Sequence, residues 1–223
     1  MCPAPPLLAR ELTGADPVAP ELRQACLQAT AALLAGVPDI VAVVGVAAET
    51  GVWPPDGRLD LTAYGPGLGG LSAGPPVPLG LGLGARLLDQ VGYSGRRQLQ
   101  SVGEQEPAAT CAALGVQLAS MAARVALLLM ADGSARRGVR APGYLDERSV
   151  PFDAAVESAI RAGDLPALLA LDPVLAHELM ATGRAGWQVL AGAMNGLRPA
   201  SEITYCDDPF GVAYLVATLR PRG

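Results

Sequence analysis

The chain has 223 residues, a length that suits one large α/β domain or two small ones, and 51% of the residues are hydrophobic. All 16 basic residues are Arg, and 21 acidic residues give a formal net charge of −5, which argues against nucleic acid or an anionic membrane as the main partner. Because Lys is absent, mechanisms that use a lysine Schiff base or a lysine phosphate clamp are excluded.

Helices and strands are predicted to alternate along the first part of the chain. Apolar residues at helical spacing predict a helix over Pro20–Gly36, and a second helix is expected over Pro107–Ala123. The runs Ile40–Val46 and Arg124–Ala131 lack polar alternation, which is typical of strands buried on both faces. This order predicts a three-layer α/β fold with a mixed central β-sheet and helices on both faces.

The stretch Gly51–Gly84 is rich in Gly and Pro. We interpret it as a long irregular excursion with one edge strand, Leu59–Tyr64. Buried-strand patterns lie on both sides of this stretch, so it does not mark a domain boundary. Residues 1–223 are therefore predicted to form a single domain.

The last third of the chain is predicted to be helical and to end in two strands. Gly163 and Gly183 are expected just beyond helix C-termini, and strands are expected over Glu202–Cys206 and Val212–Leu219. Aspartate is a favoured N-cap, and a following Pro supports one of these helix starts. The predicted N-caps are Asp153, Asp164 and Asp172, and the helix that Asp153 begins is expected to run through Ile160.

Two glycine motifs lie inside the Gly/Pro-rich stretch. Gly65–Gly70 matches the dinucleotide-binding pattern G-x-G-x-x-G, and Gly70–Gly74 matches the nucleophile-elbow pattern G-x-S-x-G. Both patterns need a helix directly after the glycines. The prolines within Pro75–Pro78 argue against such a helix, and so against nucleotide binding.

The single histidine, His177, is predicted to face water. On a helix over Asp172–Thr182 it is turned about 200° from Leu175, which belongs to the expected buried stripe. Glu178 follows Leu175 by three residues and Val174 by four, so it flanks the stripe and lies either at a rim or in a pocket. The residues of the expected stripe are Val174, Leu175 and Leu179.

The stretch Gly143–Met194 contains short motifs in a defined order: Gly-Tyr, Phe-Asp, Gly-Asp, Ala-Leu-Leu, Leu-Asp-Pro, Glu, Gly-Arg and Leu-x-Gly-Ala. That order resembles the C-terminal half of the class III extradiol ring-cleavage dioxygenases of the LigB type and of the MEMO-like proteins. The resemblance implies their three-layer α/β fold. Enzymes of this family hold Fe(II) with two histidines and a carboxylate, and use a further histidine as acid/base.

The resemblance also shows what this chain lacks. The family's Pro-His-Pro-Pro corresponds to a segment with Ala4, its Ser-Pro-His to one with Ala47 and Ala48, and its G-D-x-S-H to one with Ala135. A site of two histidines and one carboxylate needs two neutral imidazoles, which one histidine cannot supply. The sequence therefore predicts a degenerate family member without a metal or other cofactor, although Glu178 matches the iron carboxylate of the family.

A cleft is expected beyond the carboxyl ends of the strands, where open α/β sheets bind ligands. The sequence thus predicts a LigB-like homologue without ring-cleavage activity. Its cleft would take a small anionic or aromatic molecule, or serve as a surface for a protein partner or a second copy. The candidate cleft residues are Glu49, Asp132, Ser134, Arg136, Arg137, Tyr144 and Glu178.

Two enzymatic alternatives remain open. One is a metal-dependent oxidoreductase or dioxygenase with an atypical site of carboxylates and a thiol, in which oxygen ligands would favour Mg or Mn. The other is a metal-free serine hydrolase that uses Ser72 or Ser134, since Ser72, Asp132 and His177 follow the chain order of α/β-hydrolases.

The four cysteines are widely spaced and are predicted to be buried, reduced thiols. The N-terminus has no basic segment followed by an apolar run, and the apolar run Val125–Ala131 is too short to cross a bilayer. A soluble, cytoplasmic protein is expected. The cysteines are Cys2, Cys26, Cys111 and Cys206.

Overall fold

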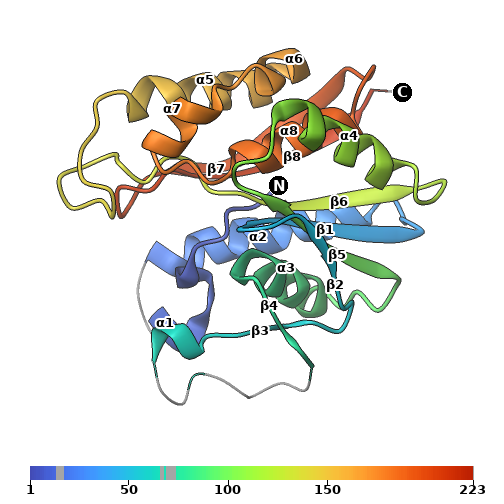
Figure 1. Cartoon of the computed structure of the whole chain (residues 1–223). Coiled ribbons are helices and arrows are strands. Elements are labelled where there is room, and N and C mark those ends of the chain that lie inside the picture. Colours follow the sequence, from blue (N-terminus) through green and yellow to red (C-terminus); the bar gives the residue numbers. More distant parts are fainter. Residues whose placement is uncertain (14–17, 66–67, 69–73, 223) are drawn as a thin grey trace.

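The computed structural model describes residues 1–13, 18–65, 68 and 74–222. Its central sheet has the strand order β2-β5-β1-β6 (Figure 1). Strands β5, β1 and β6 are parallel, and β2 is antiparallel to β5, so the sheet is mixed as predicted. The strands are β1 (Ile40–Ala47), β2 (Gly51–Trp53), β5 (Arg97–Gly103) and β6 (Val125–Met130).

Two further pairs of strands flank this sheet. Strands β3 (Arg58–Leu59) and β4 (Pro76–Val77) form a short parallel pair. Strands β7 (Pro199–Asp207) and β8 (Tyr214–Pro221) form an antiparallel hairpin with an irregular register near its middle. The two strands of this hairpin are longer than the predicted Glu202–Cys206 and Val212–Leu219 but occupy the same part of the chain.

The first two residues join the hairpin to the central sheet. The N–H of Cys2 donates to the Leu129 carbonyl of β6 at 2.8 Å, and Ala131 donates back to Cys2 at 2.9 Å. On the other side, Met1 and Ala217 of β8 exchange two hydrogen bonds. The order of neighbouring segments is thus β2-β5-β1-β6, then residues 1–2, then β8-β7.

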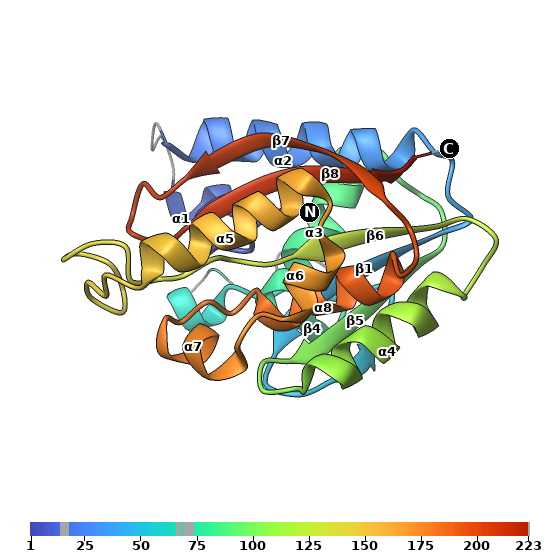
Figure 2. The same ribbon diagram turned by 90° about the horizontal axis from the view of Figure 1, so that it is seen from above.

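Helices cover both faces of the strands (Figures 1 and 2). One face carries α1 (Arg10–Thr13), α2 (Val18–Leu34) and α3 (Leu79–Gln90), with the short 3-10 helices η1 (Pro6–Leu8) and η2 (Thr62–Tyr64). The other face carries α4 (Ala108–Ala119), α5 (Ser149–Ala162), α6 (Leu165–Leu169), α7 (Pro173–Glu178) and α8 (Arg184–Ala193). No helix in the described part of the chain is long and apolar enough to span a membrane.

Strand β1 shows why the prediction of a doubly buried strand is correct. Its side chains alternate between two hydrophobic cores. Ala42 and Val44 pack in the core under α4, α5 and α8, whereas Val41 and Val43 pack in the core with α2 and α3. Both faces of the strand are covered, so both sets of alternate residues are apolar.

Two of the three predicted aspartate caps are confirmed, and the third is wrong. Asp164 accepts a hydrogen bond from Ala167 at 3.0 Å, and Asp172 accepts one from Val174 at 2.8 Å. Asp153 instead lies inside α5, where its carboxylate is bound by another part of the chain. A buried aspartate with a distant partner has the same local sequence signal as an N-cap.

Two glycines were predicted to lie just beyond helix C-termini. The prediction is confirmed for Gly163 and wrong for Gly183. Gly163 adopts the left-handed conformation, with φ 67°, just after α5. Gly183 precedes α8 rather than ending α7, and its N–H donates to the Asp132 carbonyl at 2.8 Å. A Cβ at Gly183 would lie 2.5 Å from that carbonyl oxygen, so close backbone approach explains the glycine.

The interpretation of Gly51–Gly84 as an irregular excursion is wrong at both ends. Gly51–Trp53 forms β2, and α3 begins at Leu79, directly after the prolines that argued against a helix. The predicted edge strand Leu59–Tyr64 is also wrong: only Leu59 belongs to a strand, β3, and Thr62–Tyr64 forms η2. Helix α3 has glycine at alternate positions because it packs closely: a Cβ at Gly84 would lie 2.4 Å from Val43 Cγ1.

Candidate functional site

The carboxyl ends of β1 and β6 meet at one edge of the sheet, beside the segment that follows Cys2. The N–H of Ala4 donates to Asp132 Oδ1 at 2.8 Å, so two of the predicted site positions are in contact. Ala47 is the last residue of β1, and Ala48 follows it at the surface. Since ligands of open α/β sheets bind beyond the carboxyl ends of strands, this edge is the candidate site.

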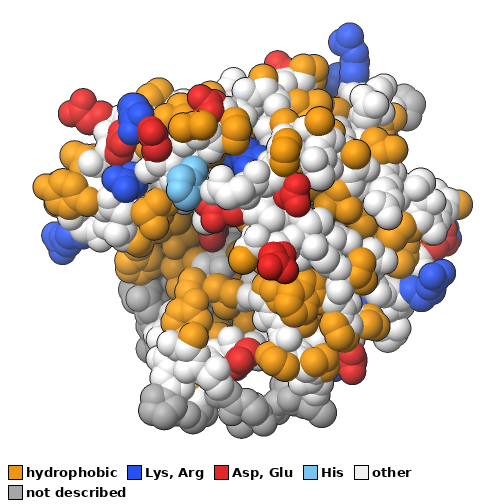
Figure 3. Space-filling view, viewed as in Figure 1, with side chains coloured by type: hydrophobic (Ala, Val, Ile, Leu, Met, Phe, Trp, Pro, Cys, Tyr) orange, Lys and Arg blue, Asp and Glu red, His pale blue; other side chains and the backbone are white. Residues whose placement is uncertain are grey.

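The surface of the molecule is hollowed near the single histidine. Figure 3 shows this hollow beside the pale-blue side chain of His177, with hydrophobic side chains along its wall. In that view the hollow lies below α7, on the side where the loop after β6 emerges. The family positions Ala4, Ala47, Ala48 and Ala135 carry only methyl side chains.

Asp132 is a half-buried carboxylate with few hydrogen-bond partners. Its Oδ1 accepts the Ala4 N–H, and the part of the chain that the structure describes gives its side chain no other hydrogen bond and no ion pair. Burial raises the pKa of Asp132 from 3.8 to about 6, against the opposing effect of the Ala4 N–H. A carboxyl group that titrates near neutral pH at a strand end is a candidate for ligand binding or proton transfer.

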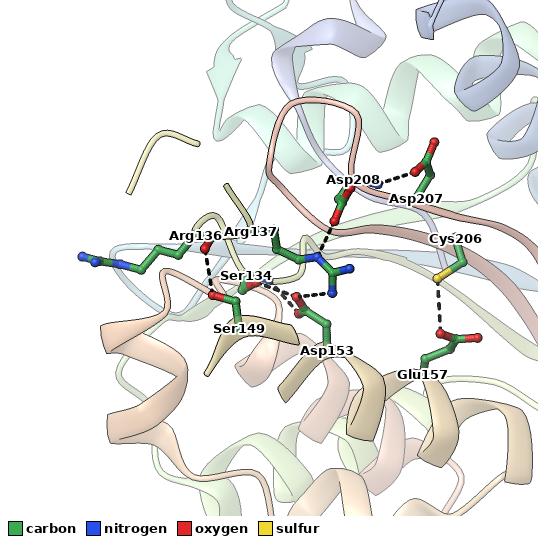
Figure 4. Close-up of polar contacts among 9 residues, drawn as sticks. All are labelled: Ser134, Arg136, Arg137, Ser149, Asp153, Glu157, Cys206, Asp207 and Asp208. Atoms are coloured by element: carbon green, nitrogen blue, oxygen red, sulfur yellow. Dashed lines mark hydrogen bonds and ion pairs between the residues drawn. The ribbon is translucent and has the colours of Figure 1, made fainter. Parts of the chain in front are cut away.

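Ser134 is buried and bound to a carboxylate from α5 (Figure 4). Asp153 Oδ1 accepts the Ser134 N–H at 2.9 Å, and Asp153 Oδ2 accepts the Ser134 hydroxyl at 2.5 Å. Arg137 bridges Asp153, at 3.4 Å, and Asp208 of the turn after β7. Burial raises the pKa of Asp153, although Ser134 and Arg137 both favour its ionised form.

This network fastens the loop after β6 to α5 and to the turn after β7. The Gly133 N–H donates to the Ala213 carbonyl at 2.8 Å, which adds a backbone contact to the same junction. The hydroxyl of Ser134 is therefore a donor to Asp153 rather than a nucleophile beside an imidazole. His177 has other contacts, with Gln105 at 3.0 Å and Glu104 at 3.3 Å, and Ser72 lies outside the described residues.

The buried face of helix α7 differs from the predicted stripe. Val174 is 65% exposed, whereas Ala176 and Leu179 are buried, so the buried face is rotated around the helix axis relative to the prediction. His177 is exposed as predicted. Glu178 points to the surface, where its carboxylate lies 2.7 Å from Arg148, and Arg148 also pairs with Asp146 at 2.7 Å.

The remaining cleft candidates form no hydrogen bond or ion pair with Asp132 in the described part of the chain. Arg136 carries a buried Nε that has no partner among the described residues, and Figure 4 shows its side chain pointing away from the Ser134 network. Tyr144 has φ 60° and is 64% exposed in the loop after β6. Glu49 is exposed after β1, and its carbonyl accepts a hydrogen bond from Ser101. Among the described residues, Asp132 is the only one of the seven candidates with a hydrogen bond to a family position, Ala4.

The residues at this edge do not fit the Fe(II) site that the family resemblance implies. Within the described ranges, no three side chains of His, Cys, Asp or Glu gather closely enough to hold a metal ion. The alternative site of carboxylates and a thiol is not assembled there either, because Glu178 is paired with Arg148 and Glu49 is exposed. Among the cysteines, Cys206 is exposed, contrary to the prediction, and the other three are buried.

Arg184 is a structural determinant of this edge that the sequence did not reveal. It is 2% exposed, and its guanidinium donates to the carbonyls of Glu104 and Glu106 and to Gln188 Oε1. These bonds hold the loop after β5 against α8. An arginine paired with distant carbonyls leaves no local pattern, and its only sequence signal is the Gly-Arg motif.

Comparisons with known proteins define the fold and nothing finer. No family model matches the chain, and no curated protein matches its sequence. The structure is similar to the crystal structure of the uncharacterized protein JW3007 from Escherichia coli K12, with a TM-score of 0.51 and 14% sequence identity. The match covers 86% of this chain and 90% of that chain, so the likeness extends over nearly the whole domain.

Proposed function

We propose that this protein is a LigB-like homologue that binds a small aromatic molecule at the carboxyl edge of its sheet without iron-dependent ring cleavage. The motif order of Gly143–Met194 and the three-layer fold support the family assignment. Alanine at the family's histidine positions supports the loss of ring cleavage. The single observation that carries the binding proposal is the half-buried carboxyl group of Asp132, which accepts one hydrogen bond.

Asp132 favours a ligand that carries a hydroxyl or another hydrogen-bond donor. A half-buried carboxylate bound to one N–H gains from a second donor, which a phenolic hydroxyl supplies. An anionic ligand would meet the charge of Asp132. Arg137, which could offset that charge, already bridges Asp153 and Asp208. The arrangement therefore supports the aromatic member of the two predicted ligand classes over the anionic one.

The test is calorimetric titration of the purified protein with phenol and with benzoate at pH 7.5. Phenol is expected to bind saturably, and benzoate at least roughly tenfold more weakly. Asp132→Asn keeps the acceptor for Ala4 but removes the charge, and it is expected to weaken phenol binding roughly tenfold. Asp56→Asn, at an exposed position, is the matched control and should leave phenol binding unchanged.

Three results would contradict this function. Equal binding of benzoate and phenol, or equal binding by the wild-type and Asp132→Asn proteins, would remove Asp132 from the site. Saturable, near-stoichiometric binding of Fe(II) by the protein would show a rebuilt metal site and would overturn the loss of metal chemistry.

A further inference from the structure

A groove of about 440 Å³ lies at the opposite end of the sheet, between β6 and β8. Residues 1–2 fill the space between these strands only near the carboxyl end of β6. Toward the amino end of β6, the same space is lined by Val125–Leu129 on one side and by Thr218–Pro221 on the other. The groove thus lies in line with the extended residues Met1 and Cys2, on the Met1 side, where a strand between β6 and β8 would continue.

The backbone on both sides of the groove has the hydrogen-bonding pattern of strand edges. Cys2 bonds to Leu129 and Ala131, so odd-numbered residues of β6 turn their backbone groups toward the groove, and even-numbered ones toward β1. By this alternation the N–H of Leu129 and the carbonyl of Leu127 face the groove. On β8, Ala217 bonds to Met1, so Leu219 is the next residue with both groups turned the same way.

The walls of the groove are apolar. One wall comes from α2, through Ala29, Ala32 and Leu33, and the other from α4 and α8, through Ala119, Leu190 and Ala193. The alanines among them leave room for the side chains of an inserted strand, which would alternate between the two walls. A lipid chain would fill the apolar space but would form no hydrogen bonds with the backbone groups of either edge.

The mouth of the groove is positively charged. Arg124 and Arg220 both line it, at the amino end of β6 and near the end of β8. Arg124 pairs with Asp39 at 2.7 Å, whereas Arg220 is exposed and has no acidic partner in the described part of the chain. An acidic residue near the amino end of an inserted segment would complement this charge.

We propose that the groove docks an extended segment of another polypeptide, about five residues long, by β-strand addition. The segment runs parallel to β6 and antiparallel to β8, with its carboxyl end toward Met1. Its side chains are small and apolar, and an acidic residue near its amino end faces Arg220. This site is separate from the Asp132 edge, so the test of the groove and the test of the proposed function are independent.

The test uses a fluorescein-labelled peptide, Glu-Val-Ala-Val-Ala, with blocked ends, and measures fluorescence anisotropy on titration with the full chain. Saturable binding is expected for the wild-type protein. Ala32→Phe fills the groove and is expected to weaken binding at least roughly tenfold. Ala31→Phe, at the exposed neighbouring position of α2, is the matched control and should leave binding within about twofold of the wild type.

A peptide with the same side chains and N-methyl groups at both Val residues separates strand addition from apolar contact. It cannot donate those backbone hydrogen bonds, and it is expected not to bind. Absence of binding of the unmodified peptide to folded protein would overturn the proposal. Equal binding of the N-methylated peptide would overturn it as well, as would tight binding of dodecanoate that Ala32→Phe blocks while no peptide binds, since the groove would then be a lipid site.

Discussion

The two ends of the sheet present different chemistry. At the carboxyl end, side chains from distant elements satisfy one another, as Ser134, Asp153 and Arg137 do, and Arg184 holds a loop through its carbonyls. Asp132 is left there with a single N–H. At the amino end, the groove between β6 and β8 is lined by apolar side chains and by strand edges. In the two proposals, the first end recognises a ligand through one side chain, and the second through main-chain groups.

The largest effect is expected from Arg184→Met, which tests how far side chains hold the carboxyl end together. The substitution removes a buried cation and leaves the carbonyls of Glu104 and Glu106 without donors. We expect the free energy of unfolding to fall by about 4 kcal/mol. Urea denaturation measures it, with Arg198→Met at an exposed position as the control. An equal, small effect of both substitutions would show that the loop after β5 does not depend on Arg184.

Asp132→Asn is expected to stabilise the protein at neutral pH. The pKa of Asp132 is raised from 3.8 to about 6 in the folded protein, so the unfolded chain releases this proton at lower pH. Stability is unaffected by this group below pH 4, falls as pH rises through the window from 4 to 6, and is lower by up to about 3 kcal/mol at pH 7.

Thermal unfolding at pH 4 and pH 7 measures this effect for the wild-type and Asp132→Asn proteins. The variant should be the more stable of the two at pH 7 and equal to the wild type at pH 4. A variant less stable than the wild type at pH 7 would mean that the ionised carboxylate is well solvated or paired, and the contrast between the two ends of the sheet would be lost.

Ser134→Ala examines the junction between the loop after β6 and α5. It removes the hydroxyl that donates to buried Asp153, and we expect a loss of about 2 kcal/mol of stability. Ser158→Ala, on the exposed face of the same helix α5, should change stability by less than about 0.5 kcal/mol. Chemical denaturation compares the two variants. A loss of hydrolytic activity with no loss of stability would instead return Ser134 to the role of nucleophile.

The smallest effect is expected at the groove. Ala32→Leu adds apolar surface that the groove accommodates, and we expect stability to rise by about 1 kcal/mol. Ala31→Leu places the same side chain in water on α2 and should be nearly neutral. Differential scanning calorimetry provides the comparison. A destabilised Ala32→Leu protein would show that the space is already filled.

Sequence reasoning succeeded where local signals decide the structure. The continuous apolar run of β1 follows from burial on both faces, and Asp164 and Asp172 cap helices because the following N–H groups need acceptors. It failed where a distant contact decides. Asp153 is bound by Ser134, and α3 tolerates alternate glycines because it packs closely on Val43.

The candidate site was predictable in the same uneven way. The family resemblance led to Ala4 and Asp132, and the structure places them in contact through a hydrogen bond. It also matched Glu178 to the iron carboxylate of the family, and the helical pattern placed Glu178 either at a rim or in a pocket. Glu178 lies at the surface beside Arg148, and the buried stripe of α7 includes Ala176 rather than Val174. Three or four apolar residues do not determine which side of a helix as short as α7 is buried, and a rotation of half a turn changes that side.

The most direct test of the central claim is the pKa of Asp132, measured by carbon NMR of the labelled carboxyl group with and without saturating phenol. A pKa near 6 is expected in the free protein. Phenol should lower that pKa, because its hydroxyl donates to the ionised carboxylate and favours that form. A pKa near 4 in the free protein, or one that phenol leaves unchanged, would contradict a carboxyl group whose ionised form is disfavoured by burial and that binds the ligand.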